Sequence, residues 1–187
     1  MDPTILKKAF DKYYEAPLSV WVNFFSCCET VTFNKDEIIK QANEREKYFY
    51  FIAAGSAGIF LWKKNNFVCL DFAFENNFYC DYMSFLSGES TPLQSMALEK
   101  SEMLRIGKIK FFEFAKKPYG QIILRIAAET SFIDKQKQQI DLLTKTANER
   151  YQDLIDKFPC IMERTPQKHI ASYLGITPQS LSRLRKI

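Results

Sequence analysis

The last 24 residues constrain the fold more than any other part of the chain. This segment, "RTPQKHIASYLGITPQSLSRLRKI", contains two short helical patterns on either side of Gly175. A glycine at such a point can adopt the left-handed backbone conformation that a sharp turn between helices requires. Thr177 and Pro178 then provide a cap and a first residue for the second helix. The spacing predicts a helix-turn-helix unit over residues 164–187.

Each of the two predicted helices has an apolar face and a polar face. The inward positions are Ile170, Ala171, Leu174, Ile176, Leu181 and Leu184. At about 100° per residue, the opposite face of the second helix presents Gln179, Ser182, Arg183 and Lys186. His169 falls on the outer face of the first helix, where we expect a solvated side chain.

The outward face of the second helix suits the major groove of DNA. Arg183 can donate two hydrogen bonds to guanine, and Gln179 can bond adenine in the same bidentate way. Ser182, between them, is the third predicted base-reading residue. The residues that we expect to contact phosphates are Thr177, Ser180, Arg185, Lys186 and Lys168. A helical hairpin that binds another protein is the alternative, and the absence of acidic residues from this face disfavours it.

Positive charge is concentrated in the same segment. Residues 164–187 hold five basic residues and no Asp or Glu, whereas the rest of the chain has 21 Lys and Arg against 22 acidic residues. The formal net charge of +4 therefore comes from the end of the chain. A local excess of this kind favours binding to a polyanion.

A different pattern fills residues 31–106. Short apolar and aromatic runs alternate with turn signals, such as Gly55 with Ser56 and Ser87 with Gly88. Many of the 17 Phe and 9 Tyr residues lie in these runs, which is typical of strands. The spacing predicts an antiparallel sandwich or roll.

Residues 118–147 are predicted to form one long helix. Apolar residues recur there at a spacing of three and four, as in a two-stranded coiled coil. Glu129 and Gln136 interrupt the seam, and the segment is otherwise polar all round. A dimerisation helix is therefore favoured over a helix that packs only on its own β domain. The predicted dimer seam consists of Ile122, Ile126, Ile133, Ile140 and Leu143.

The chain as a whole resembles the Crp/Fnr family of bacterial transcription regulators, and most of all its compact members common in Bacteroidetes. The resemblance covers roughly residues 5–187 and rests on "FNKDEII", "YFYFIAAGSAGIFL", "LDFAFENNFYCDYMSFLSGES", "ALEKSEMLRI" and the terminal segment. It implies an α+β fold in three parts. These are a cyclic-nucleotide-binding-like β-roll, or jelly roll (1–117), a long dimerisation helix (118–147) and a helix-turn-helix DNA-binding domain (148–187).

The resemblance implies a homodimeric regulator of transcription that binds double-stranded DNA. Two symmetry-related recognition helices would read a near-palindromic operator in major grooves about 34 Å apart. Activation of transcription would require a contact with RNA polymerase, which is a candidate further partner. The resemblance does not identify an effector.

Cyclic-nucleotide binders of this family use a phosphate-binding cassette that carries Gly-Glu and then an Arg. Here the Gly-Glu position reads Cys80 and Asp81, and the Arg position falls at Pro92 or Leu93. No Lys or Arg occurs in residues 65–99. A buried phosphate without a cation would carry a large desolvation penalty. We therefore expect that this β-roll does not respond to cyclic AMP.

Two other effector hypotheses stay open at this point. Arg125 on the long helix could supply a charge for a nucleotide from outside the cassette. The aromatic strands could instead line a pocket for a neutral or apolar effector that controls DNA binding. Enzyme activity is not expected, because the sequence has no phosphate-binding glycine loop or nucleophile motif, and its one histidine lies in the terminal segment.

No metal, cofactor or membrane association is expected. The five cysteines form no CxxC pair, so buried reduced thiols are the favoured interpretation. The longest apolar run, residues 48–62, is shorter than the about 20 residues that span a bilayer, and Gly55 and Gly58 interrupt it. The N-terminus lacks the apolar core of a signal peptide. These features predict a cytoplasmic location.

Overall fold

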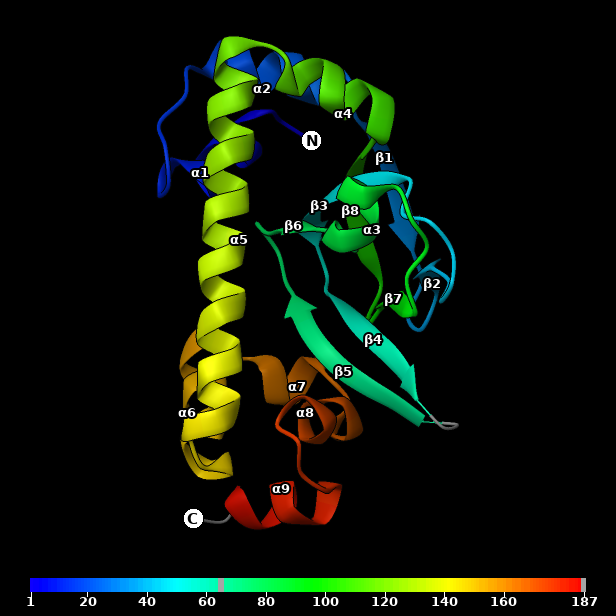
Figure 1. The fold of residues 1–187 in the computed structure, drawn as a ribbon, viewed down its shortest axis with the longest axis vertical. Helices are drawn as coiled ribbons and strands as arrows, with labels where there is room; N and C mark the ends of the chain where they lie inside the picture. The colour runs from blue at the N-terminus through cyan, green and yellow to red at the C-terminus, as the bar shows by residue number, and fades with distance from the viewer. Residues whose placement is uncertain (64–65, 186–187) are drawn as a thin grey trace.

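The computed structural model describes residues 1–63 and 66–185 and has an α+β fold (Figure 1). A β-roll lies beside one long helix, α5 (Pro118–Thr144), and shorter helices lie at both ends of α5. The prediction of a β-roll and a long helix is confirmed. None of the described helices has the length and apolarity needed to cross a membrane.

Two four-stranded sheets form the roll, and neighbouring strands in each are antiparallel. The first sheet has the order β1 (Glu29–Phe33), β8 (Ser101–Gly107), β3 (Tyr48–Ala54) and β6 (Phe78–Tyr79). The second has the order β2 (Ile38–Lys40), β7 (Leu93–Ala97), β4 (Ala57–Lys63) and β5 (Asn66–Ala73). Because β1 pairs with β8, the first and last strands of the roll are held together.

The turn between the two sheets depends on Gly55. Its φ of +91° lies in the region that side chains rarely adopt. A Cβ at this position would lie 2.3 Å from Oγ of Ser101 and would overlap it. Since this turn carries the chain from β3 to β4, a glycine is required there to close the roll.

Three helices cover one end of the roll, namely α1 (Thr4–Asp11), α2 (Leu18–Phe25) and α4 (Lys108–Ala115). They pack with the first sheet and the start of α5 in a core rich in aromatic rings, such as the edge-to-face pair of Phe24 and Phe114. Gly120 lets α5 approach α4, because a Cβ there would lie 2.0 Å from the carbonyl oxygen of Phe114. The largest fully buried side chains of this core are Leu6, Trp21, Phe51, Ile52, Phe85, Met103 and Ile106.

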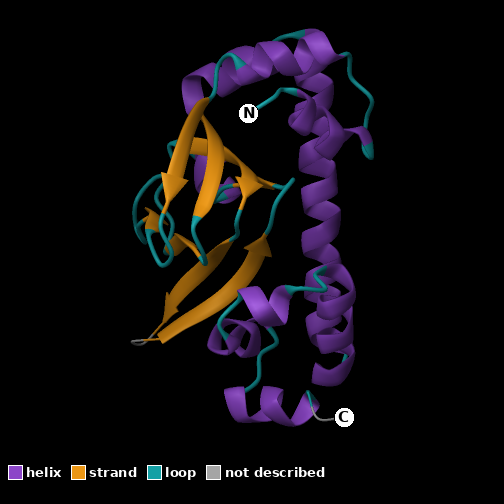
Figure 2. Ribbon diagram, turned by 180° about the vertical axis from the view of Figure 1, so that it is seen from behind, coloured by secondary structure: helices purple, strands orange, loops and turns teal. Residues whose placement is uncertain are grey.

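The C-terminal helices are α6 (Ala147–Lys157), α7 (Ile161–Arg164), α8 (Gln167–Tyr173) and α9 (Pro178–Leu184). A capping box of Thr146 and Glu149 begins α6. These helices share a second core with the β4–β5 hairpin, which reaches toward α7 and α8 (Figures 1 and 2). The buried members of this core include Phe60, Phe72, Phe74, Leu98, Leu154, Ile161, Ile170, Leu174 and Leu181. The C-terminal helices are thereby anchored on the β-roll.

His169 lies within this second interface, so the expectation of a solvated side chain is wrong. The residue is 7% exposed, and its ring centroid lies 4.7 Å from that of Phe60. Helical spacing places His169 away from the contact between α8 and α9, but β4 covers that side of α8. Burial lowers the pKa of His169 to about 4, and the positive charge of Lys168 adds to this shift.

Candidate functional site

The predicted effector cassette begins where β6 runs toward α3 (Tyr82–Ser87). Cys80 and Asp81 join these elements, and both are buried. Oδ1 of Asp81 accepts a hydrogen bond from the backbone N–H of Ser84 at 3.2 Å and so caps α3. Burial raises the pKa of the Cys80 thiol well above its usual value, so this cysteine stays protonated.

A lysine of the second sheet pairs with the Asp81 carboxylate. Nζ of Lys40 in β2 lies 2.9 Å from Oδ2 of Asp81, and the two side chains are 3% and 1% exposed. The same ammonium group donates to Oγ1 of Thr91 at 3.1 Å and to the carbonyl oxygen of Leu93 at 2.7 Å. The Thr91 hydroxyl in turn donates to Oδ2 of Asp81. Both charged groups are therefore satisfied within the protein.

This arrangement determines what the cassette can bind. A ribose hydroxyl could reach Asp81 only by displacing Lys40 or Thr91, which would leave a buried charge without its partner. Pro92 is exposed and Leu93 is half-buried, while Thr91, next to them in sequence, is the residue that faces Asp81. The Asp81 carboxylate is therefore neutralised by partners within the chain.

Glu46 is a second buried carboxylate beside the cassette, and it was missed from the sequence. It is 4% exposed and accepts hydrogen bonds from the backbone N–H groups of Lys47 at 3.0 Å, Tyr48 at 3.2 Å and Asp81 at 3.3 Å. Burial raises the pKa of Glu46, although these hydrogen bonds and the charge of Lys40 oppose the shift. Glu46 thus ties the segment before β3 to the cassette.

The turn between α8 and α9 has the chemistry that the sequence indicated. Gly175 has a φ of +68°, and the backbone N–H of Ile176 donates to the carbonyl oxygen of Ala171 at 2.9 Å. Oγ1 of Thr177 accepts a hydrogen bond from the backbone N–H of Ser180 at 3.1 Å, and Pro178 is the first residue of α9. These contacts set the start and the direction of α9.

One face of α9 is open to solvent. The three predicted base-reading residues, Gln179, Ser182 and Arg183, are all exposed. Of the predicted phosphate contacts, Lys168, Thr177 and Arg185 are exposed, and Ser180 is half-buried. Lys186 lies outside the described residues. Six of these eight side chains are therefore exposed, five of them from Thr177 onward and Lys168 on α8, while Ser180 is half-buried beside the cap.

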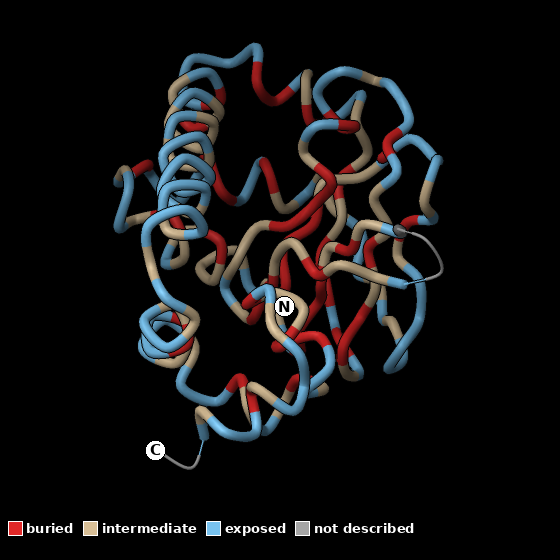
Figure 3. Tube along the Cα trace, turned by 60° about the horizontal axis from the view of Figure 1, so that its bottom comes forward, coloured by how far each residue is buried: buried red, intermediate tan, exposed pale blue. Residues whose placement is uncertain are grey.

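The long helix α5 exposes an apolar stripe in its C-terminal half. Ile133, Ile140 and Leu143 are 50%, 55% and 81% exposed, and much of α5 is drawn as exposed in Figure 3. Ile122 and Ile126, in the other half of the predicted seam, are half-buried, and Ile126 packs against the first core. A row of exposed large aliphatic side chains is typical of an interaction surface.

Polar contacts also fix the C-terminal helices to the roll. The Arg164 guanidinium lies 2.6 Å from a carboxylate oxygen of both Glu75 and Glu99. Burial alone would raise the pKa of Glu75, but the hydrogen bonds from Arg164 and from backbone N–H groups, together with the charge of Arg164, lower it. Oγ of Ser172 in α8 accepts a hydrogen bond from the backbone N–H of Cys69 at 2.9 Å. One of the five basic charges near the C-terminus is thus neutralised within the chain.

No metal site is evident in residues 1–63 and 66–185, where no three His, Cys, Asp or Glu side chains are grouped to hold an ion. Cys69 and Cys80 are buried, Cys27 and Cys28 are half-buried, and Cys160 is exposed. The expectation that Cys160 is a buried thiol is wrong, because it lies in the exposed turn before α7.

Comparison with known proteins defines the class of the fold. Residues 30–117 match the cyclic nucleotide-binding domain family. A search of curated proteins gives no match. The chain therefore carries a β-roll of the cyclic nucleotide-binding type, followed by a long helix and a group of C-terminal helices.

Solved structures with this fold include regulators of the Crp/Fnr type. FixK2 from Bradyrhizobium japonicum has a TM-score of 0.70 at 19% identity, over 85% of this chain and 83% of that chain. A mutant of CooA from Carboxydothermus hydrogenoformans gives 0.67 at 15% identity, over 97% and 82%. The catabolite activator protein of Thermus thermophilus gives 0.60 at 14% identity, over 95% and 84%. At these identities the likeness shows that this chain shares their fold.

Proposed function

We propose that the chain is a dimeric, sequence-specific DNA-binding transcription regulator of the Crp/Fnr type. The exposed face of α9 is the observation that carries the proposal. Arg183 and Gln179 have the donor and acceptor groups for bidentate hydrogen bonds to guanine and adenine, and Ser182 lies beside them. Lys168 and Arg185, also exposed, would hold the phosphate backbone.

Dimerisation through α5 is part of the same proposal. A second copy would cover the stripe of Ile133, Ile140 and Leu143 with its own stripe, as a two-fold symmetric interface requires. Two copies of α9 would then enter successive major grooves about 34 Å apart and read a near-palindromic operator.

The β-roll is proposed not to respond to cyclic AMP. The buried pair of Lys40 and Asp81 supports this, because the carboxylate that would bind a ribose hydroxyl already has an internal partner. Displacement of Lys40 would cost more free energy than a hydrogen bond from one ribose hydroxyl would supply.

A second candidate function is a sensor for a small apolar molecule, and one observation favours it. A cavity of about 50 Å³ lies between the first sheet and helices α2, α4 and α5, with an apolar and aromatic lining, and it would have to widen to admit such a molecule. It is lined in part by Trp21 and Tyr82, whose Nε1 and hydroxyl groups are buried without a hydrogen-bond partner among the described residues. Mass spectrometry of small molecules released on denaturation would identify such an effector, and a purified protein that releases none would count against it.

Selection from a random-sequence duplex library with the full chain tests the regulator proposal. We expect enrichment of near-palindromes whose half-sites are separated by about 10 base pairs. Arg183→Ala should weaken binding to the enriched duplex by about 1–3 kcal/mol and relax the preference at one base position. A library that yields no enriched sequence would contradict the proposal.

A further inference from the structure

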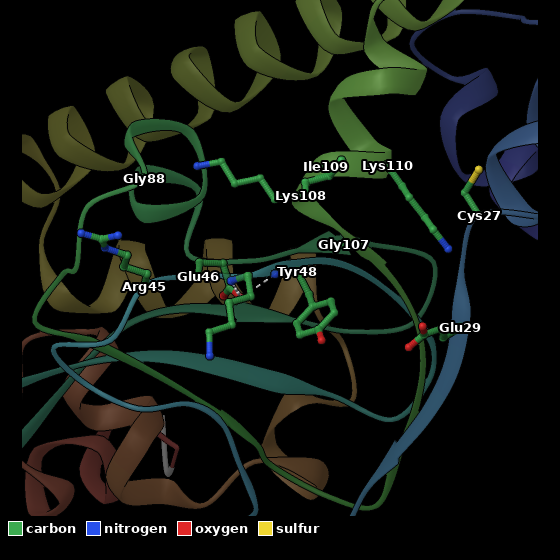
Figure 4. Close-up of a pocket in the computed structure, with 11 residues that line it drawn as sticks. Cys27, Glu29, Arg45, Glu46, Tyr48, Gly88, Gly107, Lys108, Ile109 and Lys110 are labelled. Carbon is green, nitrogen blue, oxygen red and sulfur yellow. Dashed lines mark hydrogen bonds between the residues drawn. The ribbon is translucent and has the colours of Figure 1, made fainter.

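A second, larger cavity opens on the β-roll at the start of α4 (Figure 4). Its volume is about 650 Å³, within the range of small-molecule sites. The segment before β3, the end of α3 at Gly88, the end of β8 and the first turn of α4 form its walls. Its described lining includes none of Cys80, Asp81, Pro92 and Leu93, although Glu46, which lies beside the cassette, forms part of one wall.

Four basic side chains line this cavity, and they are Arg45, Lys47, Lys108 and Lys110. Within the described part of the chain, none of the four forms an ion pair with a carboxylate. Figure 4 shows Arg45 and Lys108 at the end of the cavity near Gly88, and Lys110 at the other end. The cavity therefore concentrates positive charge that the described chain does not neutralise.

The two carboxylates in the lining already have other partners. Oε2 of Glu29 accepts hydrogen bonds from Nε and Nη2 of Arg105 at 3.1 Å and 3.0 Å. Glu46 is buried, and its oxygens accept three backbone hydrogen bonds, as described above. Among the described residues, neither carboxylate forms an ion pair with any of the four cationic groups.

The first turn of α4 carries positive charge where helices usually carry negative charge. Lys108 and Lys110 occupy its first turn, which has no acidic residue and no side-chain cap. The positive end of the helix dipole disfavours cations, and the first N–H groups of a helix have no acceptor within it. The backbone N–H of Lys108 donates to the carbonyl oxygen of Lys47 at 3.0 Å, so a bound anion would chiefly offset the unfavourable placement of the two lysines.

Lys108 lies near two aromatic rings beside the cavity. Its Nζ lies 5.8 Å from the ring centroid of Phe85 and 6.0 Å from that of Phe112. Gly88 ends α3 with a φ of +76°, and a Cβ there would lie 3.3 Å from the same nitrogen. At these distances each ring adds a weak attraction for the cation.

We propose that this cavity binds a phosphorylated small molecule that carries at least two negative charges. Phosphate oxygens accept hydrogen bonds from several cationic donors at once, which suits Arg45 and Lys108 at one end of the cavity, and a second negative group would meet Lys110 at the other end. The Tyr48 ring and the Ile109 side chain, which is 78% exposed, provide an apolar surface for the rest of the molecule. This proposal concerns only the binding of a small molecule, and it does not depend on the proposed recognition of DNA.

Isothermal titration calorimetry of the full chain with inorganic pyrophosphate tests this site. In about 0.15 M salt, where long-range surface attraction is screened, we expect a Kd below about 1 mM. Lys108→Gln combined with Lys110→Gln should weaken binding by at least roughly tenfold, since it removes two charged donors. The matched control, Lys116→Gln combined with Lys117→Gln, removes two charges at the other end of α4 and should change Kd by less than about twofold.

The folding of the variants is measured separately. Because two lysines at the start of a helix are unfavourable without an anion, Lys108→Gln combined with Lys110→Gln should keep or raise the Tm of the free protein. Equal losses of affinity in the two double variants, or no binding by the unaltered chain, would overturn the proposal. A polyglutamate peptide that binds at least roughly tenfold more tightly than pyrophosphate would also overturn it, in favour of an acidic protein partner.

Discussion

Nζ of Lys40 and Oδ2 of Asp81 lie 2.9 Å apart inside the β-roll, and the two side chains are 3% and 1% exposed. Lys40 belongs to the second sheet, and Asp81 follows the last strand of the first sheet. The pair therefore joins the two sheets at the cassette. It also provides from within the chain the positive charge that residues 65–99 lack.

Removal of the lysine alone should destabilise the protein strongly. Lys40→Met leaves the Asp81 carboxylate buried without its cation, which typically costs about 3–5 kcal/mol in the free energy of unfolding. Urea denaturation followed by circular dichroism measures the loss. Lys40→Met combined with Asp81→Asn should recover at least half of it, because asparagine can still cap α3 and carries no charge. A loss below about 1 kcal/mol in the single variant would show that the pair is not buried as described.

Protonation of His169 should weaken the fold in mild acid. Burial lowers its pKa in the folded chain from 6.5 to about 4. Between these values the unfolded chain binds a proton that the folded chain does not, so the free energy of unfolding falls as the pH falls through this window. Between pH 7 and pH 4, the free energy of unfolding of the His169→Gln variant should therefore fall by up to about 3 kcal/mol less than that of the wild type. Urea denaturation at several pH values measures the difference, and parallel profiles for the two proteins would contradict this prediction.

A charge on the exposed stripe of α5 should prevent dimerisation. Leu143 is 81% exposed in the single chain, and a glutamate there would be buried opposite its own copy in the proposed dimer. We expect Leu143→Glu to sediment as a monomer at concentrations where the unaltered chain is dimeric. Leu142→Glu is the matched control, because this residue is also exposed but projects about 100° away around the helix. Equal sedimentation of the two variants would argue against a dimer through this stripe.

Local patterns predicted much of this fold. The run from Pro118 predicted α5, and the spacing around Gly175, Thr177 and Pro178 matches the turn into α9. Such features depend on residues close in sequence, since caps, turns and helical periodicity act over a few positions. The exposed side chains of α9 follow from the same periodicity.

Contacts between distant segments were not predictable in the same way. Lys40 ends the short run "IIK" and meets Asp81 only because β2 and the start of α3 are brought together by the roll. Glu46 lies in the polar stretch "NEREK", which is typical of a solvated turn. His169 is buried because β4 packs on α8. Helical periodicity cannot predict such a contact, because it depends only on residues within the helix.

The central claim is that α9 reads DNA sequence and that cyclic AMP does not control this binding. Fluorescence anisotropy with the selected duplex tests the claim most directly. The selected duplex is compared with a scrambled duplex of the same length at one salt concentration, with and without the nucleotide. We predict a Kd at least roughly a thousandfold lower for the selected duplex, and no change on addition of cyclic AMP. Equal affinity for the two duplexes, or selective binding only in the presence of cyclic AMP, would contradict the account.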